Sequence, residues 1–349
     1  MGAIWFWIVA LMIAAYVVLD GFDIGVGILY PFLARDEQDR GIMMRSIGPV
    51  WDGNEVWLLA GGGTLYFAFP LLYASAFSGF YLPLMIVLWL LIMRGASIEL
   101  RAHVDSDVWR SFFDGLFFVS SSLLAIFFGA ALANVIRGVP LGEDNYFFLP
   151  LWTNWRVGPQ PGILDWYTVI GGVVALVALA THGALYLAMK ATDELEIRAL
   201  KLAKNAWIAL CAVTLISLPA TIWVRPVSLT NYQTHPVLFV IPLAVLVTLA
   251  GMRIYTQKGK VLAAFLSSCG YLIFMLVGAA VGLYPVLLPS SSDPDRDITV
   301  AKALSGLHAL HVGLVWWSFG MLLALAYFVV TYWMFRGKIS VHEEGGYGH

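Results

Sequence analysis

Two pairs of carboxylates near the start of the chain are the residues whose type and spacing could do chemistry. Asp20 and Asp23 interrupt a long apolar segment, and Asp52 and Glu55 open the next one. Each pair has an i, i+3 spacing, which places both acids on one face of a helix. A carboxylate in a low-dielectric site can load and release protons near neutral pH, as in proton relays. The pattern predicts a water-lined proton route, with the alternative that the acids only bond to helix ends.

Glycines and tryptophans surround these acids. A small-xxx-small pair of glycines beside the first acid pair allows another helix backbone to approach closely. Three consecutive glycines follow the second acid pair and leave room for another helix or a cofactor-bearing subunit, and two tryptophans there are typical interface anchors. Eight residues are expected to serve helix packing or interfaces. They are Gly21, Gly25, Gly61, Gly62, Gly63, Trp51, Trp57 and His182, the last in the middle of an apolar segment.

Glu99 and His182 are further polar residues inside apolar segments. Glu99 lies between Arg94 and Arg101, so an ion pair with one of these arginines is expected, and a place in the proton route is the alternative. A buried histidine can ligate haem iron, but a hydrogen bond to a neighbouring helix is the expected role of His182. The sequence has no spacing typical of a metal site, a phosphate-binding loop or a catalytic triad. No catalytic residue and no metal ligand is therefore assigned.

The composition places these residues in a membrane protein. Of the 349 residues, 60% are hydrophobic and 12% are charged, and the mean hydropathy is +0.81. Soluble domains have about 25% charged residues, so a soluble fold of this composition would expose large apolar patches. The composition excludes an ordinary soluble enzyme, a disordered chain and a coiled coil. The net charge of −2 provides no basic surface for nucleic acid.

Stretches without charged residues mark the expected membrane spans of an all-α, polytopic single domain over 1–349. A spanning helix needs about 20 apolar residues, because the hydrocarbon layer is about 30 Å thick and each residue rises about 1.5 Å. The uncharged stretch 56–93 would be about 57 Å long as one helix, so we expect two helices with a turn between Pro70 and Ser78. The nine expected spans lie at approximately 5–33, 51–70, 78–100, 114–136, 164–189, 204–224, 236–254, 261–288 and 308–335.

The distribution of basic residues predicts the orientation. When lysines and arginines are assigned to successive loops, 15 of the 20 fall on alternate loops at one side. Cytoplasmic loops carry the excess of Lys and Arg, so the N-terminus is expected outside and the C-terminus in the cytoplasm. Residues 1–19 have no basic n-region, so a cleaved signal peptide is not expected. The Gly- and His-rich tail 341–349 is expected to fray.

Five segments carry a resemblance to a known family. They are Asp20–Gly27 (DGFDIGVG), Gly48–Leu58 (GPVWDGNEVWL), Ala76–Tyr81 (AFSGFY), Thr181–Leu187 (THGALYL) and Tyr284–Ser291 (YPVLLPSS). These segments resemble the signature segments of subunit II of cytochrome bd-type quinol oxidases. The resemblance runs over essentially the whole chain, and the nine-span count with an external N-terminus agrees with it.

The resemblance implies a role in respiration. In this family subunit II pairs with a subunit I of similar fold, which ligates two b-type haems and one d-type haem and carries the quinol-oxidising loop. Quinol electrons reduce O₂ to water with cytoplasmic protons, in a bacterial or archaeal cytoplasmic (inner) membrane. The resemblance implies that this chain ligates no haem, supports the haem-bearing subunit and contributes to proton access.

The family motifs also imply roles for single residues. The carboxylate of the Trp-Asp-Gly-Asn motif is Asp52, which is the first candidate for the proton path, followed by Asp20, Asp23 and Glu55. Some members have Gln at the positions of Glu55 and His182, so neither an essential acid nor a haem ligand is implied there. Some members hold a structural quinone, and the sequence leaves open a bound quinone or lipid, a small single-helix accessory subunit, and the choice between ubiquinol and menaquinol.

Two other functions are compatible with acids inside membrane helices. A proton-coupled secondary transporter has intramembrane acids and Gly-broken helices, but it should show two related halves. The acidic motifs of this chain have no clear second copy. A purely structural scaffold, in which the acids only hold helices together, is the other alternative.

Overall fold

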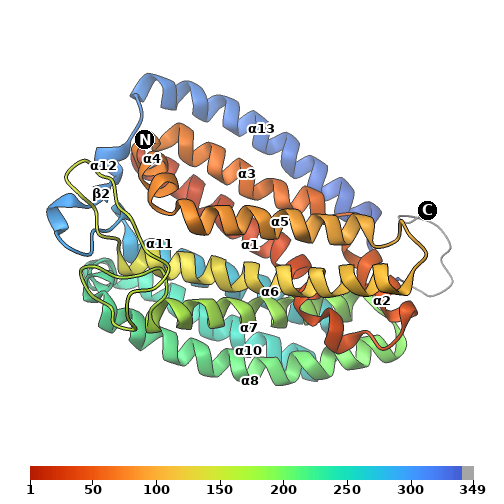
Figure 1. Cartoon of the computed structure of the whole chain (residues 1–349). Helices are drawn as coiled ribbons and strands as arrows, with labels where there is room; N and C mark the ends of the chain where they lie inside the picture. The colour runs from red at the N-terminus through yellow and green to blue at the C-terminus, as the bar shows by residue number, and fades with distance from the viewer. Residues whose placement is uncertain (340–349) are drawn as a thin grey trace.

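The computed structural model describes residues 1–339, which fold into a bundle of long helices with roughly aligned axes (Figure 1). Eight helices are long and apolar enough to cross a membrane, and the chain is a multi-pass membrane protein. Their bounds are α1 Gly2–Leu33, α5 Tyr81–Leu100, α6 Asp107–Arg137, α7 Trp166–Lys190, α8 Asp193–Val224, α10 Val240–Gln257 with the 3-10 turn before it, α11 Val261–Leu283 and α13 Leu307–Met334.

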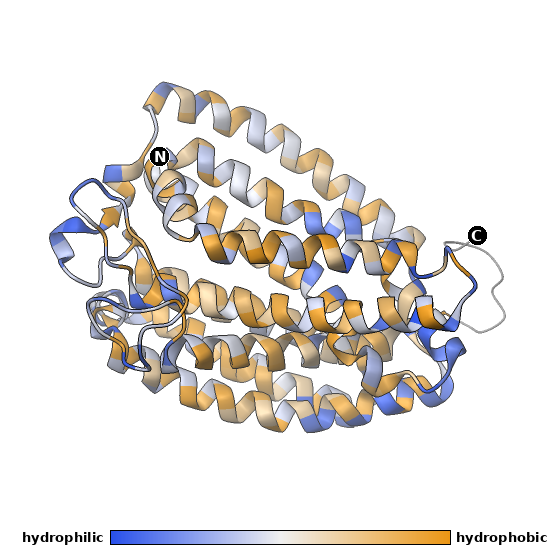
Figure 2. Cartoon of the chain, viewed as in Figure 1, coloured by the Kyte–Doolittle hydropathy of each residue, from blue (hydrophilic) through white to orange (hydrophobic). Residues whose placement is uncertain are grey.

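Shorter elements join these helices. The connections hold α2 Glu37–Ile47, α3 Trp51–Ala68, α4 Pro70–Gly79, α9 Thr230–Thr234 and α12 Val300–Ala303, with 3-10 turns η1 Pro226–Leu229, η2 Pro236–Phe239 and η3 Pro294–Arg296. Strands β1 Val286–Leu288 and β2 Ile298–Thr299 form a small antiparallel pair. Figure 2 shows that hydrophilic residues gather at the two ends of the bundle, while the middle is mainly hydrophobic.

Two expected boundaries were wrong, and one helix begins before its expected span. The segment between Pro70 and Ser78 is the helix α4 and not a turn, because Pro70 occupies a first helical position, where its missing N–H costs nothing. The expected span 261–288 ends as a helix at Leu283, since Pro285 disfavours a helical conformation in the residue before it, and β1 follows. Helix α8 begins at Asp193, where first-turn acids favour a helix start.

Helix α3 is not among the eight helices with the composition of a span. Its first two turns hold Asp52, Asn54 and Glu55, which lower its average hydropathy. Its 18 residues correspond to about 27 Å. The count of nine spans therefore stays a prediction that depends on α3.

Helix α1 lies at the centre of the bundle and packs against α3, α6, α7 and α11. Its contact with α7 is close enough to require glycine on both helices. A Cβ atom added at Gly25 would lie 2.2 Å from the Leu179 carbonyl oxygen and 2.8 Å from the Gly183 Cα. The small-xxx-small pair thus lets two backbones meet, as membrane helices do without a hydrophobic driving force.

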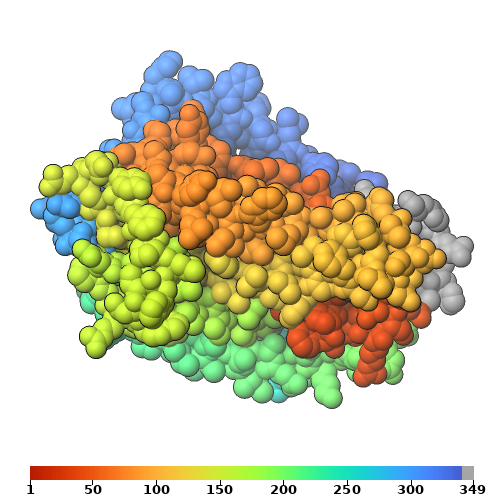
Figure 3. All heavy atoms as spheres, in the orientation of Figure 1, coloured from red at the N-terminus to blue at the C-terminus, as the bar shows by residue number. Residues whose placement is uncertain are grey.

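Helix α13 lies at the edge of the molecule. Leu310 is its only buried residue within the described part of the chain, and large side chains such as Trp316 and Leu323 are more than 70% exposed. The space-filling view shows α13 as an outer ridge beyond α3 and α5 (Figure 3). Such a face needs either lipid or another protein to cover it.

Candidate functional site

A buried group of acids around one arginine joins α1, α3 and α5. Asp20 of α1 and Arg94 of α5 have fully buried side chains, and Arg94 Nη1 donates to Asp20 Oδ1 at 2.6 Å. Arg94 Nη2 donates to Glu55 Oε2 of α3 at 3.0 Å. One guanidinium therefore bridges two carboxylates from two helices. Asp20, Asp23, Glu55 and Arg94 are called the acid–arginine cluster below.

Asp23 is held by a neutral group. Asn54 Nδ2 of α3 donates to Asp23 Oδ2 at 2.7 Å and to the Leu19 carbonyl at 3.1 Å. The Tyr332 hydroxyl of α13 donates to Asn54 Oδ1 at 2.8 Å. Asp23 is fully buried, and it has no ion pair with any cation in residues 1–339. This chain of contacts also connects the outer helix α13 to the centre of the bundle.

The charges of the cluster do not balance. Asp20, Asp23 and Glu55 face a single guanidinium. Asp20 Oδ2, Asp23 Oδ1 and Arg94 Nε have no hydrogen-bond partner among the described residues. Because burying an uncompensated carboxylate is costly, the arrangement favours a bound proton on one of the acids. It is chemically suited to accept and release protons, and it offers no nucleophile or redox group.

The cluster is not sealed from the surface. Glu55 keeps 23% of its side chain accessible. Asp52, one helical turn before it, is exposed on α3 and has no ion pair within the described chain. The structure therefore brings Asp20, Asp23 and Glu55 together and leaves Asp52 at the outer edge of the same region.

The expected ion pair of Glu99 was wrong. Glu99 is exposed, while Arg94 points into the cluster. Arg101 pairs with Asp114 at 2.5 Å and with Glu37 at 2.8 Å. The reason is helical geometry, since residues three or four apart share a face, whereas Glu99 lies five residues from Arg94 and two from Arg101.

The glycines have unequal roles. A Cβ atom at Gly21 would lie 2.9 Å from Leu179 Cδ2, so this residue joins Gly25 at the α1–α7 contact. A Cβ atom added at Gly61 would have its nearest neighbours, atoms of α1, at 3.9 Å, which is ordinary contact. Gly62 and Gly63 have nothing within 4 Å of an added Cβ atom in the described chain. These two glycines therefore leave an open strip on α3.

The tryptophans and His182 link helices. Trp51 packs on Gly95 of α5, and Trp57 is buried against Phe328 of α13, with ring centroids 5.6 Å apart. His182 Nδ1 lies 2.7 Å from Ser268 Oγ, and Nε2 lies 2.9 Å from the Val18 carbonyl. A carbonyl only accepts, so Nε2 carries the proton.

Both ring nitrogens of His182 are thus engaged by protein groups that tie α7 to α1 and α11. Within residues 1–339 no group of three His, Cys, Asp or Glu side chains is placed to hold a metal ion. His182 therefore has no free ring nitrogen to offer an iron in this structure.

Sequence reasoning missed three members of the site. Arg94, Asn54 and Tyr332 connect the acids to α5, α3 and α13. An arginine that follows a long uncharged stretch is as costly in a membrane as an acid. Weighing Arg94 in the same way as the acids would have indicated a buried counter-ion.

The fold and the cluster define a polytopic membrane protein that buries more carboxylates than cations. Residues 1–335 match the family model of cytochrome bd terminal oxidase subunit II. The chain belongs to this family.

Known relatives cover nearly the whole chain. Cytochrome bd-I ubiquinol oxidase subunit 2 of Escherichia coli is 32% identical over 371 aligned positions, covering 97% of this chain and 95% of the relative. Cytochrome bd ubiquinol oxidase subunit 2 of Bacillus subtilis is 31% identical, covering 98% and 97%. A chain of the solved bd oxidase from Geobacillus thermodenitrificans has a TM-score of 0.74 at 16% identity, covering 96% of this chain and 98% of that one, which shows a shared fold.

Proposed function

We propose that this chain is the subunit II of a quinol:O₂ oxidoreductase and that its acid–arginine cluster contributes to proton access toward the haem-bearing subunit. Family membership makes the chain a subunit of a cytochrome bd oxidase complex, with a partner subunit I. The relatives from Escherichia coli and Bacillus subtilis are named as ubiquinol oxidase subunits. Two b-type haems and one d-type haem belong to the partner in this proposal. They supply the electron transfer from quinol to O₂ when bound there.

We propose nine spans, with α3 as the second. Helix α3 packs along α1 and, at about 27 Å, approaches the hydrocarbon thickness. The end of the bundle that holds α2 is opposite the end that holds the N-terminus (Figure 1). The 15 basic residues of the alternate loops support a cytoplasmic location for the α2 end. The N-terminus then lies outside, the C-terminus lies inside, and the membrane is a bacterial or archaeal cytoplasmic membrane.

The face formed by α3 and α13 is the proposed contact with subunit I. Gly62 and Gly63 form an open strip on α3, and α13 exposes most of its apolar surface. Asp52 is exposed on the same helix α3. An acid that faces lipid is costly, whereas an acid at a protein interface can stay hydrated or bonded. A partner over this face would cover Asp52 and lie close to the cluster.

The proposed proton path runs from exposed to buried acids. Asp52 and Glu55 share one face of α3 through their i, i+3 spacing. Glu55 reaches Arg94, which in turn holds Asp20, and Asp23 lies one helical turn further along α1. Glu99, exposed near the end of α5, is the last of the proposed acids. The observation that carries the proposal is the excess of buried carboxylates over the single guanidinium.

Two isosteric substitutions test this role in the assembled oxidase. Asp52→Asn and Asp23→Asn remove a protonatable oxygen but keep the size of the side chain. We expect each to lower quinol-driven O₂ consumption by about ten-fold, because a positioned proton-transfer group contributes at least that much. The haem content of both variants should equal that of wild type. Asp23→Asn should change the free energy of unfolding by no more than about 1 kcal/mol, because its hydrogen bond is to a neutral amide.

Asp105→Asn is the matched control, since Asp105 is 94% exposed in a loop and lies outside the cluster. Unchanged O₂ consumption in both Asp52→Asn and Asp23→Asn would exclude the proton role. Loss of haem at unchanged activity per haem would instead favour the scaffold function.

A further inference from the structure

One part of the chain has only positive charges. No Asp or Glu stands between Glu196 and Asp293, a stretch that covers most of α8 and all of α10 and α11. Its basic residues gather mainly at the α2 end of the bundle, while Arg225 is at the other end. Those at the α2 end, after the ion-paired Arg198, are Lys201, Lys204, Arg253, Lys258 and Lys260.

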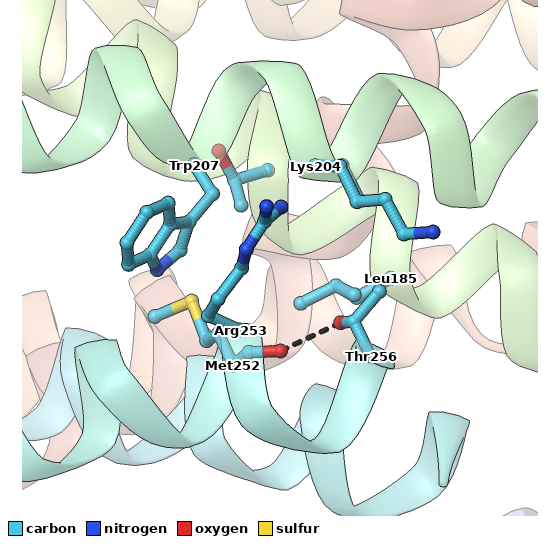
Figure 4. Close-up of a pocket in the computed structure, with 8 residues that line it drawn as sticks. Leu185, Lys204, Trp207, Met252, Arg253 and Thr256 are labelled. Atoms are coloured by element: carbon cyan, nitrogen blue, oxygen red, sulfur yellow. Dashed lines mark hydrogen bonds between the residues drawn. The ribbon is translucent and has the colours of Figure 1, made fainter. Parts of the chain in front are cut away.

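Two of these residues line a small cavity between α8 and α10. Figure 4 shows Lys204 and Trp207 on α8 and Arg253 and Thr256 on α10 around this cavity. The Arg253 guanidinium lies 5.5 Å from the centre of the Trp207 ring. Trp207 Nε1 donates to the Leu249 carbonyl at 2.7 Å, which fixes the indole between the two helices.

Neither cation has an acidic partner. Lys204 and Arg253 make no ion pair in residues 1–339, whereas Arg198 on the same helix α8 pairs with Asp39. Lys204 is exposed and Arg253 is half-buried. Two like charges that line one cavity repel each other, so the site is complementary to an anion.

The depth of the cavity matches the membrane boundary. From Lys204 to Val224 at the other end of α8, 20 residue steps correspond to about 30 Å, the thickness of the hydrocarbon layer. Trp207 lies one helical turn deeper than Lys204, at the level where tryptophan is enriched at membrane interfaces. Lipid phosphates occur at this level.

We propose that the phosphate of an anionic phospholipid from the leaflet at the α2 end binds over the outer mouth of the cavity between α8 and α10. Arg253 and Lys204 contact the phosphate oxygens, as basic pockets between membrane helices do. Trp207 orients the Arg253 guanidinium through its ring face and contacts the glycerol region. The ligand class is a phospholipid with net negative charge, and the site does not involve the acid–arginine cluster.

Native mass spectrometry of the assembled oxidase tests the proposal, with phosphatidylglycerol or phosphatidylcholine added in titration. We expect wild type to bind phosphatidylglycerol more tightly than phosphatidylcholine. Arg253→Gln and Lys204→Gln should each weaken phosphatidylglycerol binding by about five-fold, the contribution of one basic residue near an anionic lipid. The double variant should lose about the product of the two effects.

Arg35→Gln is the charge-matched control, because Arg35 is an exposed basic residue that follows α1, outside the cavity. It should leave the affinity unchanged. Arg253→Lys keeps the charge and should retain most of the binding, which keeps the test informative if Arg253→Gln does not assemble.

Equal losses of phosphatidylglycerol affinity in Arg35→Gln and Arg253→Gln would mean that binding depends only on the overall surface charge. This result would overturn the proposal. Unchanged phosphatidylglycerol binding in the double variant would do the same. If inorganic phosphate alone protects wild type from heat as well as phosphatidylglycerol does, the cavity takes free phosphate and not a lipid.

Discussion

Within residues 1–339 two arginine–aspartate pairs are deeply buried, and they differ in how completely their polar atoms are hydrogen-bonded. Arg94 and Asp20 lie in the acid–arginine cluster, where Glu55 competes for the same guanidinium. Arg137 and Asp165 form the second pair, between the end of α6 and the start of α7. Both pairs have at most 1% of their side chains exposed.

In the second pair every polar atom has a partner. Arg137 Nη2 donates to Asn134 Oδ1 at 2.6 Å, Nη1 donates to the Gly162 carbonyl and to Asp165, and Nε donates to the Gly138 carbonyl. Asp165 Oδ1 accepts the backbone N–H groups of two residues in the first turn of α7 at 2.9 Å. One arginine thus balances one aspartate, which also caps a helix.

We propose that this difference separates a structural ion pair from a protonatable one. A balanced and fully bonded pair gains nothing from an added proton. The acid–arginine cluster has three carboxylates and one guanidinium, and two of its carboxylate oxygens lack hydrogen bonds. An added proton therefore stabilises it. Under the proposed proton role, the same residue types serve different purposes, depending on charge balance.

The largest effect is expected from Asp165→Asn. The asparagine oxygen still accepts from the backbone of α7, but Arg137 stays buried without a counter-ion. Because a guanidinium cannot be deprotonated in proteins, the free energy of unfolding should fall by about 3–5 kcal/mol. Thermal denaturation of the assembled oxidase measures the loss. O₂ consumption per haem should stay at the wild-type level, and a large drop in it would contradict the assignment of this pair as structural.

A smaller effect is expected from Arg94→Gln. This change also leaves buried acids without a cation, but carboxylates can take up protons and so avoid the full cost. The loss of stability should be about 2 kcal/mol, and it should shrink at acidic pH, where the acids are protonated. Melting curves of Arg94→Gln and Asp165→Asn over a pH series provide the comparison. Equal losses with no dependence on pH would remove the distinction between the two pairs.

The smallest effect is expected from Glu37, a half-exposed glutamate outside the spans. Burial alone would raise the pKa of Glu37, but hydrogen bonds from Arg101 and Arg40 outweigh it and lower the pKa below its ordinary value. A lowered folded-state pKa stabilises the protein above the unfolded-state value, and this stability is lost as pH falls through the folded-state value. Glu37 is half exposed, so the contribution is below about 1 kcal/mol.

Glu37→Gln should therefore lower the melting temperature slightly at neutral pH. At a pH below the ordinary range of a glutamate pKa, variant and wild type should melt at the same temperature. Differential scanning calorimetry of wild type and variant checks this. A difference that grows as the pH falls would have the wrong sign.

Sequence patterns located most of the helices because hydrocarbon imposes a minimum apolar length on every span. Helix α1 and the expected span 5–33 end at the same residue, and α7 and α13 begin or end within two residues of their expected bounds. Helix bounds outside the membrane, such as the start of α8 at Asp193, are less constrained, since water tolerates both helix and loop there. Val341–His349, expected to fray, lies outside the described residues.

The sequence by itself determined the membrane class of this protein and the identity of its unusual acids, because a carboxylate inside an apolar segment can be recognised without knowing the fold. Tertiary structure alone decided which groups pair, since Arg94 and Asp20 are 74 positions apart. Their meeting depends on how α1, α3 and α5 pack, and proximity in sequence wrongly favoured Glu99 for Arg94. Charge balance in the cluster is a property of that packing, so only the folded chain distinguishes the acid–arginine cluster, with its excess of carboxylates, from the balanced Arg137–Asp165 pair.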